Sequence, residues 1–136
     1  MFELHPQLAK DCIVIGDMPL CRALLMNNSA LPWFILVPRR ADLREIFELT
    51  EADQQQLLRE SSAFAKAIAE TFTADKLNIA AIGNMVPQLH IHHVVRYKSD
   101  PAWPAPVWGN LPPAPYADSE LAAMQEKCVT ILERCV

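Results

Sequence analysis

The chain has 136 residues, 51% of them hydrophobic and 21% charged, and a formal net charge of −4 at neutral pH. This length predicts one folded domain over residues 1–136, and the weak negative charge argues against binding nucleic acid or an anionic membrane through bulk electrostatics. No apolar stretch reaches the roughly 18 residues of a membrane span, and the N-terminus lacks the basic and apolar regions of a signal peptide. We therefore expect a cytoplasmic protein whose four cysteines, which form no CxxC pair, are reduced and buried.

Three short apolar runs, each bounded by turn-forming residues, predict three strands in the first third of the chain. The runs cover residues 12–15, 21–26 and 33–37. The turns between them leave room for little more than an antiparallel meander. A short helical segment is expected to follow over residues 43–49.

A long amphipathic helix is predicted to begin after Thr50. Thr50 is typical of an N-cap residue, and Asp53 stands three positions later, as in a capping box. Beyond this start, Leu57, Phe64 and Ile68 recur with the helical period. One stripe of the helix is therefore expected to face the core.

The second half of the chain is predicted to add two strands, a proline-rich loop and a final helix. The strands are expected over residues 77–82 and 88–97. Residues 100–136 are expected to hold the loop, anchored by Trp103 and Trp108, and then the helix. This order of elements predicts an α+β fold: a five-stranded antiparallel sheet with a long helix, a short helix and a C-terminal helix.

Three histidines lie close together at the start of the predicted last strand. On a strand over residues 88–97, alternation places Gln88, His90 and His92 in one row and turns His93 to the other face. Burying a row of one amide and two imidazoles is unfavourable unless the row has polar partners or a ligand. The row is therefore the first candidate for an active site.

The pattern of the row alone leaves three roles open. A neutral imidazole could attack phosphorus and form a covalent nucleotidyl-histidine. Two histidines that alternate on a strand could instead supply two ligands to a metal ion. They could also be hydrogen-bonded into a structural polar seam. No third metal ligand is conspicuous nearby, so a metal site is the least favoured of the three.

The segment that leads into the histidines resembles the signature of the histidine triad (HIT) family. That signature runs roughly G-x-x-V-P-H-φ-H-φ-H-φ-φ, where φ is apolar, and this chain has Gly83-Asn84-Met85-Val86-Pro87-Gln88-Leu89-His90-Ile91-His92. The resemblance extends to the order of strands and helices over about residues 12–110. It implies a HIT-like domain that forms a homodimer and needs no cofactor or metal. It also implies a hydrolase or transferase acting at the α-phosphate of a purine mononucleotide or nucleotide conjugate.

The resemblance assigns roles to both histidines of the row. His90 takes the central position, which in the family is the nucleophile, with its tautomer fixed by a backbone carbonyl. His92 takes the third position, where it would hydrogen-bond the phosphate and help to protonate the leaving group.

The resemblance also assigns nucleotide-binding positions outside the row. Gly83 and Met85 match positions where the loop backbone approaches the phosphate, and Asn84 lies between them. Asn27 falls near the place where the family often has an acidic residue that holds the ribose hydroxyls. Asn27 could equally be a simple turn residue.

The first position of the triad departs from the family pattern. Gln88 stands where the triad normally begins with histidine. Ala41 follows the basic pair Arg39-Arg40, where many members have the histidine that bonds the first triad residue. An amide can donate and accept hydrogen bonds but cannot titrate. Gln88 is therefore expected to complete the catalytic row, with hydrogen bonds that differ from those of the usual histidine. The alternative is a nucleotide-binding regulatory module of the same fold with little turnover.

Overall fold

Five strands form one antiparallel sheet in the structure, a computed structural model that describes residues 1–135. The strands lie in the order β1-β2-β3-β5-β4, and every neighbouring pair is antiparallel. Their bounds are Cys12–Asp17 for β1, Cys21–Met26 for β2, Trp33–Pro38 for β3, Lys76–Ala80 for β4 and Ile91–Arg96 for β5. The predicted five-stranded antiparallel α+β fold is confirmed.

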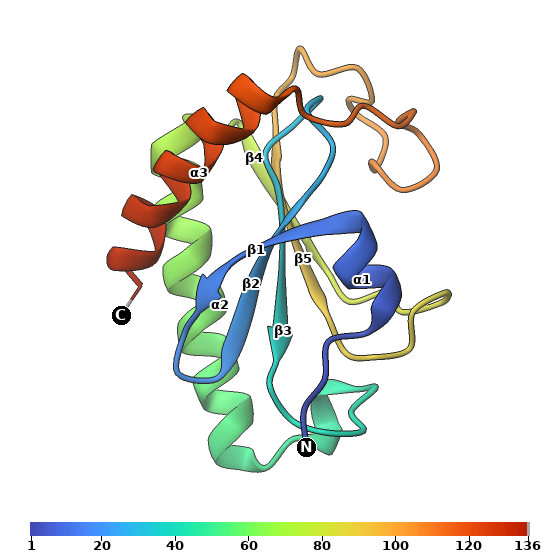
Figure 1. Cartoon of the computed structure of the whole chain (residues 1–136), viewed down its shortest axis with the longest axis vertical. Helices are drawn as coiled ribbons and strands as arrows, with labels where there is room; N and C mark the ends of the chain where they lie inside the picture. The colour runs from blue at the N-terminus through green and yellow to red at the C-terminus, as the bar shows by residue number, and fades with distance from the viewer. Residues whose placement is uncertain (136) are drawn as a thin grey trace.

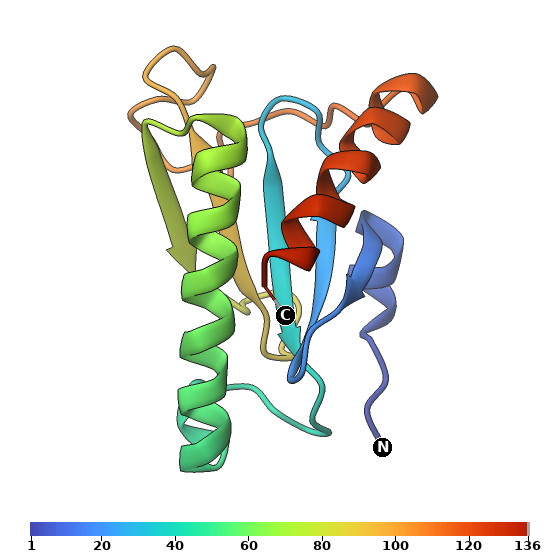
Figure 2. The ribbon, with the colours of Figure 1, turned by 90° about the vertical axis from the view of Figure 1, so that its left-hand side faces the viewer.

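The helices cover both faces of this sheet (Figures 1 and 2). The long helix α2 (Glu51–Phe72) and the C-terminal helix α3 (Asp118–Glu133) lie side by side on one face, and the short helix α1 (Pro6–Asp11) lies on the other. Alternation along the strands supplies both cores: Phe34 and Leu36 of β3 pack under α2 and α3, whereas Ile35 and Val37 pack under α1. The central strands β3 and β5 are buried along their whole length, so His92 and His93 of β5 lie in the interior of the sheet.

The start of α2 is capped as predicted, with one difference. The hydroxyl of Thr50 accepts a hydrogen bond from the backbone N–H of Asp53, at 3.1 Å. The carboxylate of Asp53 does not reach back to complete a capping box; it forms two hydrogen bonds with Arg40 instead. The N-cap prediction is confirmed, and the carboxylate serves to tie the loop after β3 to the helix.

Two short helices differ from the prediction. The segment expected over residues 43–49 contains only a three-residue 3-10 helix, η1 (Ile46–Glu48). The six-residue helix α1 was not predicted at all; Pro6 occupies its first turn, and the imidazole of His5 accepts a hydrogen bond from the N–H of Gln7. Six residues are too few to show a helical period, so α1 has no clear signal in the sequence.

The last two strands are shorter than predicted. β4 ends at Ala80 rather than at residue 82, and β5 begins at Ile91 rather than at residue 88. Pairing between β3 and β5 stops at Leu36 and Ile91, and the N–H of Leu89 donates to the carbonyl of Leu43 in the loop after β3. Residues 88–90 therefore approach the sheet as a loop, and side-chain alternation does not begin until β5.

The proline-rich segment after β5 is fixed at both ends. At its start, Asp100 accepts hydrogen bonds from Arg96 and from the backbone of the turn. Near its end, the side chain of Asn28 donates to the carbonyl of Pro112, and the N–H of Tyr116 donates to the side chain of Asn27. The segment is thereby held across the ends of β2, β3 and β5.

Candidate functional site

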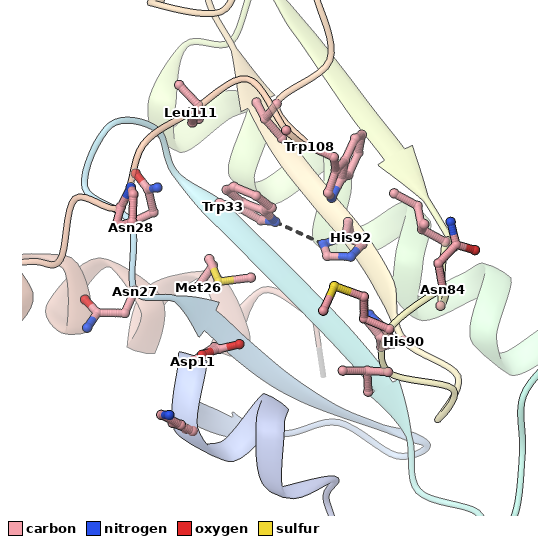
Figure 3. A pocket seen from close by; sticks show the side chains of 18 of the residues that line it. Asp11, Met26, Asn27, Asn28, Trp33, Asn84, His90, His92, Trp108 and Leu111 are labelled. Carbon is pink, nitrogen blue, oxygen red and sulfur yellow. Dashed lines mark hydrogen bonds between the residues drawn. The ribbon is translucent and has the colours of Figure 1, made fainter.

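A cavity of about 720 Å³ lies where the histidine segment meets this proline-rich segment (Figure 3). Its wall combines the two histidines with residues of α1, the end of β2, the loop after β4 and the segment that follows β5. Most of the wall is apolar, which is typical of a ligand pocket with a few polar groups that set orientation. The principal lining side chains are His90, His92, Trp33, Met26, Val107 and Trp108.

His90 is held in one tautomer by the backbone. Its Nδ1 lies 2.7 Å from the carbonyl oxygen of Gln88. A carbonyl only accepts hydrogen bonds, so Nδ1 carries the proton and Nε2 keeps its lone pair. His90 is buried and lines the cavity. This is the arrangement that a nucleophilic imidazole needs.

His92 is held in the opposite tautomer by a tryptophan. The indole N–H of Trp33 donates a hydrogen bond of 3.0 Å to Nδ1 of His92 (Figure 3). The proton of this imidazole therefore lies on Nε2. Burial lowers the pKa of His92 to about 3, with further lowering by the neighbouring His90 and His93. His92 is therefore a neutral hydrogen-bond donor near pH 7, and its ring lies 5.0 Å from that of His90.

Gln88 is not part of the row, which corrects the sequence interpretation. Its side-chain oxygen accepts a hydrogen bond from the N–H of His5, and its side-chain nitrogen donates one to the carbonyl of Glu3; both are 2.8 Å long. The amide therefore points toward the N-terminal segment and does not line the cavity that holds the histidines. Strand alternation cannot apply to Gln88, because β5 begins only at Ile91. Its backbone carbonyl, rather than its side chain, acts on His90.

His93 lies on the opposite face of β5 from His92, as predicted. Its Nε2 is 2.7 Å from the hydroxyl of Ser61 on α2, and its Nδ1 is 3.0 Å from the carbonyl of Ile91. Burial lowers the pKa of His93 to about 4. His93 is therefore a packed core histidine that does not reach the cavity.

The four predicted nucleotide-binding residues all line the same cavity. Gly83 has φ +69°, a left-handed conformation that favours glycine, at the start of the loop after β4. Asn84 and Met85 follow it, and Met85 is 94% exposed at the rim. Asn27 lies on the opposite rim, where its side-chain oxygen is bonded to Tyr116. The structure brings these residues together around the histidines; their role in binding stays a prediction.

Comparison with protein families matches this chain to the HIT domain over residues 7–99. The chain belongs to the HIT family. HIT proteins are typically nucleotide-binding hydrolases and transferases.

Solved structures of other HIT proteins closely match the whole chain. A histidine triad protein from Marinobacter aquaeolei VT8 is 52% identical, with a TM-score of 0.97, over 100% of this chain and 99% of that one. Histidine triad proteins from Bradyrhizobium japonicum and Sinorhizobium meliloti 1021 are 41% and 42% identical, with TM-scores of 0.93 and 0.92. The first covers 99% of this chain and 98% of that chain, and the second covers 96% of each. A search of curated proteins found no match.

Several cavity residues were missed by reasoning from the sequence, and four of them are polar or aromatic groups close to the predicted site. Lys10 and Asp11 reach the HIT cavity from α1, and Trp33 and Trp108 flank His92. The α1 pair has no signal in the sequence, because its helix is short and its place across the sheet is a tertiary feature. The strand that begins at Trp33 was predicted from the sequence. That the Trp33 side chain faces the histidines was not predicted.

The described part of the chain offers no grouping for a metal ion. Within residues 1–135, no three histidine, cysteine, aspartate or glutamate side chains lie close enough together to hold one. Nor does this part of the chain contain a helix of the length and apolarity that a bilayer span requires. Of the four free cysteines, Cys12, Cys21 and Cys128 are buried as predicted, whereas Cys135 is half-buried.

Proposed function

We propose that this HIT protein is a nucleotide hydrolase or transferase that acts at the α-phosphate of a nucleotide conjugate, with His90 as the nucleophile. The observation that carries the proposal is the bond between Nδ1 of His90 and the carbonyl of Gln88, which leaves Nε2 with a free lone pair inside the cavity. A neutral imidazole held in this tautomer can form a covalent nucleotidyl-histidine without a metal or cofactor.

The reaction would proceed in two steps. In the first, Nε2 of His90 forms a bond to the α-phosphorus, and the bond from phosphorus to the leaving group breaks with its electron pair going to that group. In the second, water or another acceptor attacks the phosphorus and loses a proton to solvent, and the bond from phosphorus to Nε2 breaks with its electron pair returning to neutral His90. Water gives the nucleoside monophosphate, and a different acceptor gives a transferase product.

The cavity wall suits a purine nucleotide. The apolar surfaces of Met26, Val107 and Leu111 offer a place for the base, while Nε2–H of His92 is available to a phosphate oxygen. Asn27 and the loop that contains Gly83, Asn84 and Met85 would hold the ribose and phosphate. Asp11, on the same rim as Asn27, adds a carboxylate that could accept from the ribose hydroxyls.

Gln88 makes this chain a variant of the family motif at the first triad position. Its backbone carbonyl orients His90, and its amide ties down the N-terminal segment. Gln88 would therefore be a positioning residue, not a member of the polar row.

The chain is proposed to work as a single cytoplasmic domain that forms a homodimer. The outer edge of β4 has no strand partner among residues 1–135, and its Ile79 is 49% exposed. Leu58 on the neighbouring helix α2 is also exposed. An unpaired strand edge with exposed apolar side chains is suited to pairing with a second copy. Analytical ultracentrifugation tests this part of the proposal.

Trapping of the covalent adduct tests the catalytic proposal. The protein is mixed with diadenosine triphosphate, quenched rapidly and measured by intact mass spectrometry. We expect an increase by the mass of one nucleotidyl group in the unmodified protein and in His93→Gln, a control on the opposite face of β5. His90→Ala should show neither the adduct nor turnover. Full turnover by His90→Ala would refute the proposed mechanism.

A second function is a nucleotide-binding regulatory module with little turnover. It is favoured by the position of the Gln88 side chain outside the cavity and by Ala41, which cannot hydrogen-bond through its side chain to the first triad residue. Calorimetric binding of AMP or GMP without product after long incubation would support this function. Rapid turnover of a nucleotide conjugate would exclude it.

A further inference from the structure

Two tryptophans from distant parts of the chain keep His92 neutral. Trp33, at the start of β3, donates its indole N–H to Nδ1 of His92. Protonation of His92 would place a second proton on that nitrogen, so that two N–H groups would face each other across 3.0 Å. A cationic His92 therefore requires this buried hydrogen bond to break.

Trp108 approaches the same imidazole from the proline-rich segment. The rings of Trp108 and His92 lie 5.2 Å apart at 74°, with the edge of one ring toward the face of the other. The indole nitrogen of Trp108 is buried, has no hydrogen-bond partner among residues 1–135, and lies on the side of its ring that faces His92 (Figure 3). An N–H on the ring edge that approaches a second ring interacts favourably with the neutral form of that ring and repels its cation.

No carboxylate offsets this arrangement. Among residues 1–135, the one carboxylate that lines the cavity is Asp11, which lies across the cavity from His92 and bonds to Gln7 (Figure 3). The other titratable groups that line it are His90 and the exposed Lys10 on the rim beside Asp11. His92 thus has uncharged tryptophans on both sides and no neighbouring carboxylate that would stabilise its protonated form.

We propose that the cavity selects nucleotide conjugates whose leaving group departs as an oxyanion, a carboxylate or a phosphate, and discriminates against conjugates whose leaving group is an amine. This inference rests on the proposed function and names the substrate class of the same site. It also departs from the sequence interpretation, in which His92 helps to protonate the leaving group. In the structure His92 is neutral, so its one N–H on Nε2 can donate a hydrogen bond but is too weakly acidic to protonate a leaving group.

The proton balance of the first step distinguishes oxyanion leaving groups from amine leaving groups. With an anhydride substrate, the bond between Nε2 of His90 and the α-phosphorus forms while the bond from phosphorus to the bridging oxygen breaks. The electron pair stays on that oxygen, which leaves as a stable phosphate or carboxylate and needs no proton. His90 becomes a cationic nucleotidyl-imidazolium that keeps its Nδ1–H on the carbonyl of Gln88.

An amine leaving group requires a further proton. Cleavage of a phosphorus–nitrogen bond leaves the electron pair on a nitrogen, which departs readily only if an acid protonates it. Neutral His92 is too weak an acid, and the Nδ1–H of His90 is occupied by the carbonyl of Gln88. A phosphoramidate should therefore react slowly even when it binds in the same position.

The test compares two substrates with the same nucleotide and different leaving groups. The kcat/KM values of the full-length protein are measured at pH 7 with diadenosine triphosphate and with adenosine phosphoramidate. Since a positioned general acid typically contributes about 10²-fold or more, we expect the triphosphate to be favoured by at least about 10²-fold. Equal turnover, or faster turnover of the phosphoramidate, would overturn the leaving-group inference and leave the proposed function standing. Turnover of neither substrate would overturn both.

Matched tryptophan variants show whether the indoles set the preference. Trp33→Phe removes the N–H that occupies Nδ1 of His92, so phosphoramidate turnover should rise relative to triphosphate turnover by about tenfold and should increase further as the pH falls. Trp103→Phe is the control, because Trp103 packs against Arg96 and does not line the cavity. If Trp33→Phe does not fold, Trp108→Phe should shift the ratio in the same direction. An unchanged ratio in the folded variant would overturn the inference.

Discussion

The buried ion pair at the start of the proline-rich segment should be one of the most sensitive points of the fold. Arg96 and Asp100 form two hydrogen bonds, 2.9 and 3.1 Å long, and their side chains are only 2% and 1% exposed. The carboxylate also accepts from the N–H groups of Tyr97, Ala102 and Trp103. Asp100→Asn replaces one acceptor oxygen by an NH₂ group that must face either the guanidinium or these N–H groups.

The expected loss follows from the burial of the pair. Removing one partner of a buried ion pair leaves the other uncompensated and typically costs about 3–5 kcal/mol. At about 3 °C per kcal/mol for a domain of this size, Asp100→Asn should lower the melting temperature by roughly 10–15 °C. The same substitution loosens the segment that places Trp108 beside His92, so nucleotide turnover should fall as well.

Asp53→Asn is a matched control elsewhere in the chain. Asp53 and Arg40 form two hydrogen bonds of 2.7 and 3.1 Å, but their side chains are 19% and 47% exposed. A solvent-exposed pair of this geometry typically contributes up to about 1 kcal/mol. Urea unfolding of both variants at pH 7 compares the two free energies. A loss in Asp100→Asn no larger than that in Asp53→Asn would refute the argument from burial.

The dependence of the free energy of unfolding on pH in the acid range gives a second measurement on the same pair. Burial alone would raise the pKa of Asp100, but the hydrogen bonds from Arg96 and the three backbone N–H groups lower it to about 2. An unfolded aspartate has a pKa of about 3.9. The pair therefore contributes fully above about pH 4 and loses its contribution as the pH falls toward 2. Asp100→Asn should show a smaller loss of stability across this interval than the unmodified protein.

Three further outcomes are expected. Burial lowers the pKa of folded His93 to about 4, below the unfolded value of about 6.5, so the free energy of unfolding should fall as the pH drops from 6.5 to 4. In His93→Gln, urea unfolding at several pH values should show a weaker fall over this interval. An unchanged pH dependence would contradict the assignment of this effect to His93. Gln88→Ala removes two hydrogen bonds to the N-terminal segment and should cost about 1–3 kcal/mol, while turnover falls far less than in His90→Ala because the backbone carbonyl remains. Gly83→Ala places a side chain at φ +69° and should cost about 1 kcal/mol and weaken AMP binding in calorimetry; unchanged binding would argue against a role for this loop.

Most of the fold could be predicted because its signals are local. Runs of apolar residues between prolines and turn residues marked β2 and β3, and the helical period after Thr50 marked α2. The boundaries of β4 and β5 were wrong because they depend on which residues find a pairing partner. Leu89 bonds to Leu43 outside the sheet, which no pattern in residues 88–97 indicates.

In the candidate site too, features with a local signal could be predicted from the sequence, and features that depend on distant residues could not. His90 and His92 belong to one local motif, so their proximity could be predicted from sequence. Their tautomers could not, because the partner of His92 comes from β3 and the second ring beside it comes from the proline-rich segment. The direction of the Gln88 side chain likewise depends on an N-terminal segment more than eighty residues away in the chain.

A glutamine at position 88 leaves the tautomer of His90 unaffected for a physical reason. The group that fixes the tautomer of His90 is the backbone carbonyl of residue 88, and every amino acid has that carbonyl. The side chain of residue 88 is free to serve another purpose, and here its amide holds the segment that leads into α1. Helix α1 carries Lys10 and Asp11 to the rim of the cavity. The side chain of Gln88 therefore connects the loop that holds His90 to the part of the rim furthest from it in sequence. We therefore expect changes at this position to alter nucleotide affinity more than the chemical step, so that in Gln88→Ala the KM rises by a larger factor than kcat falls.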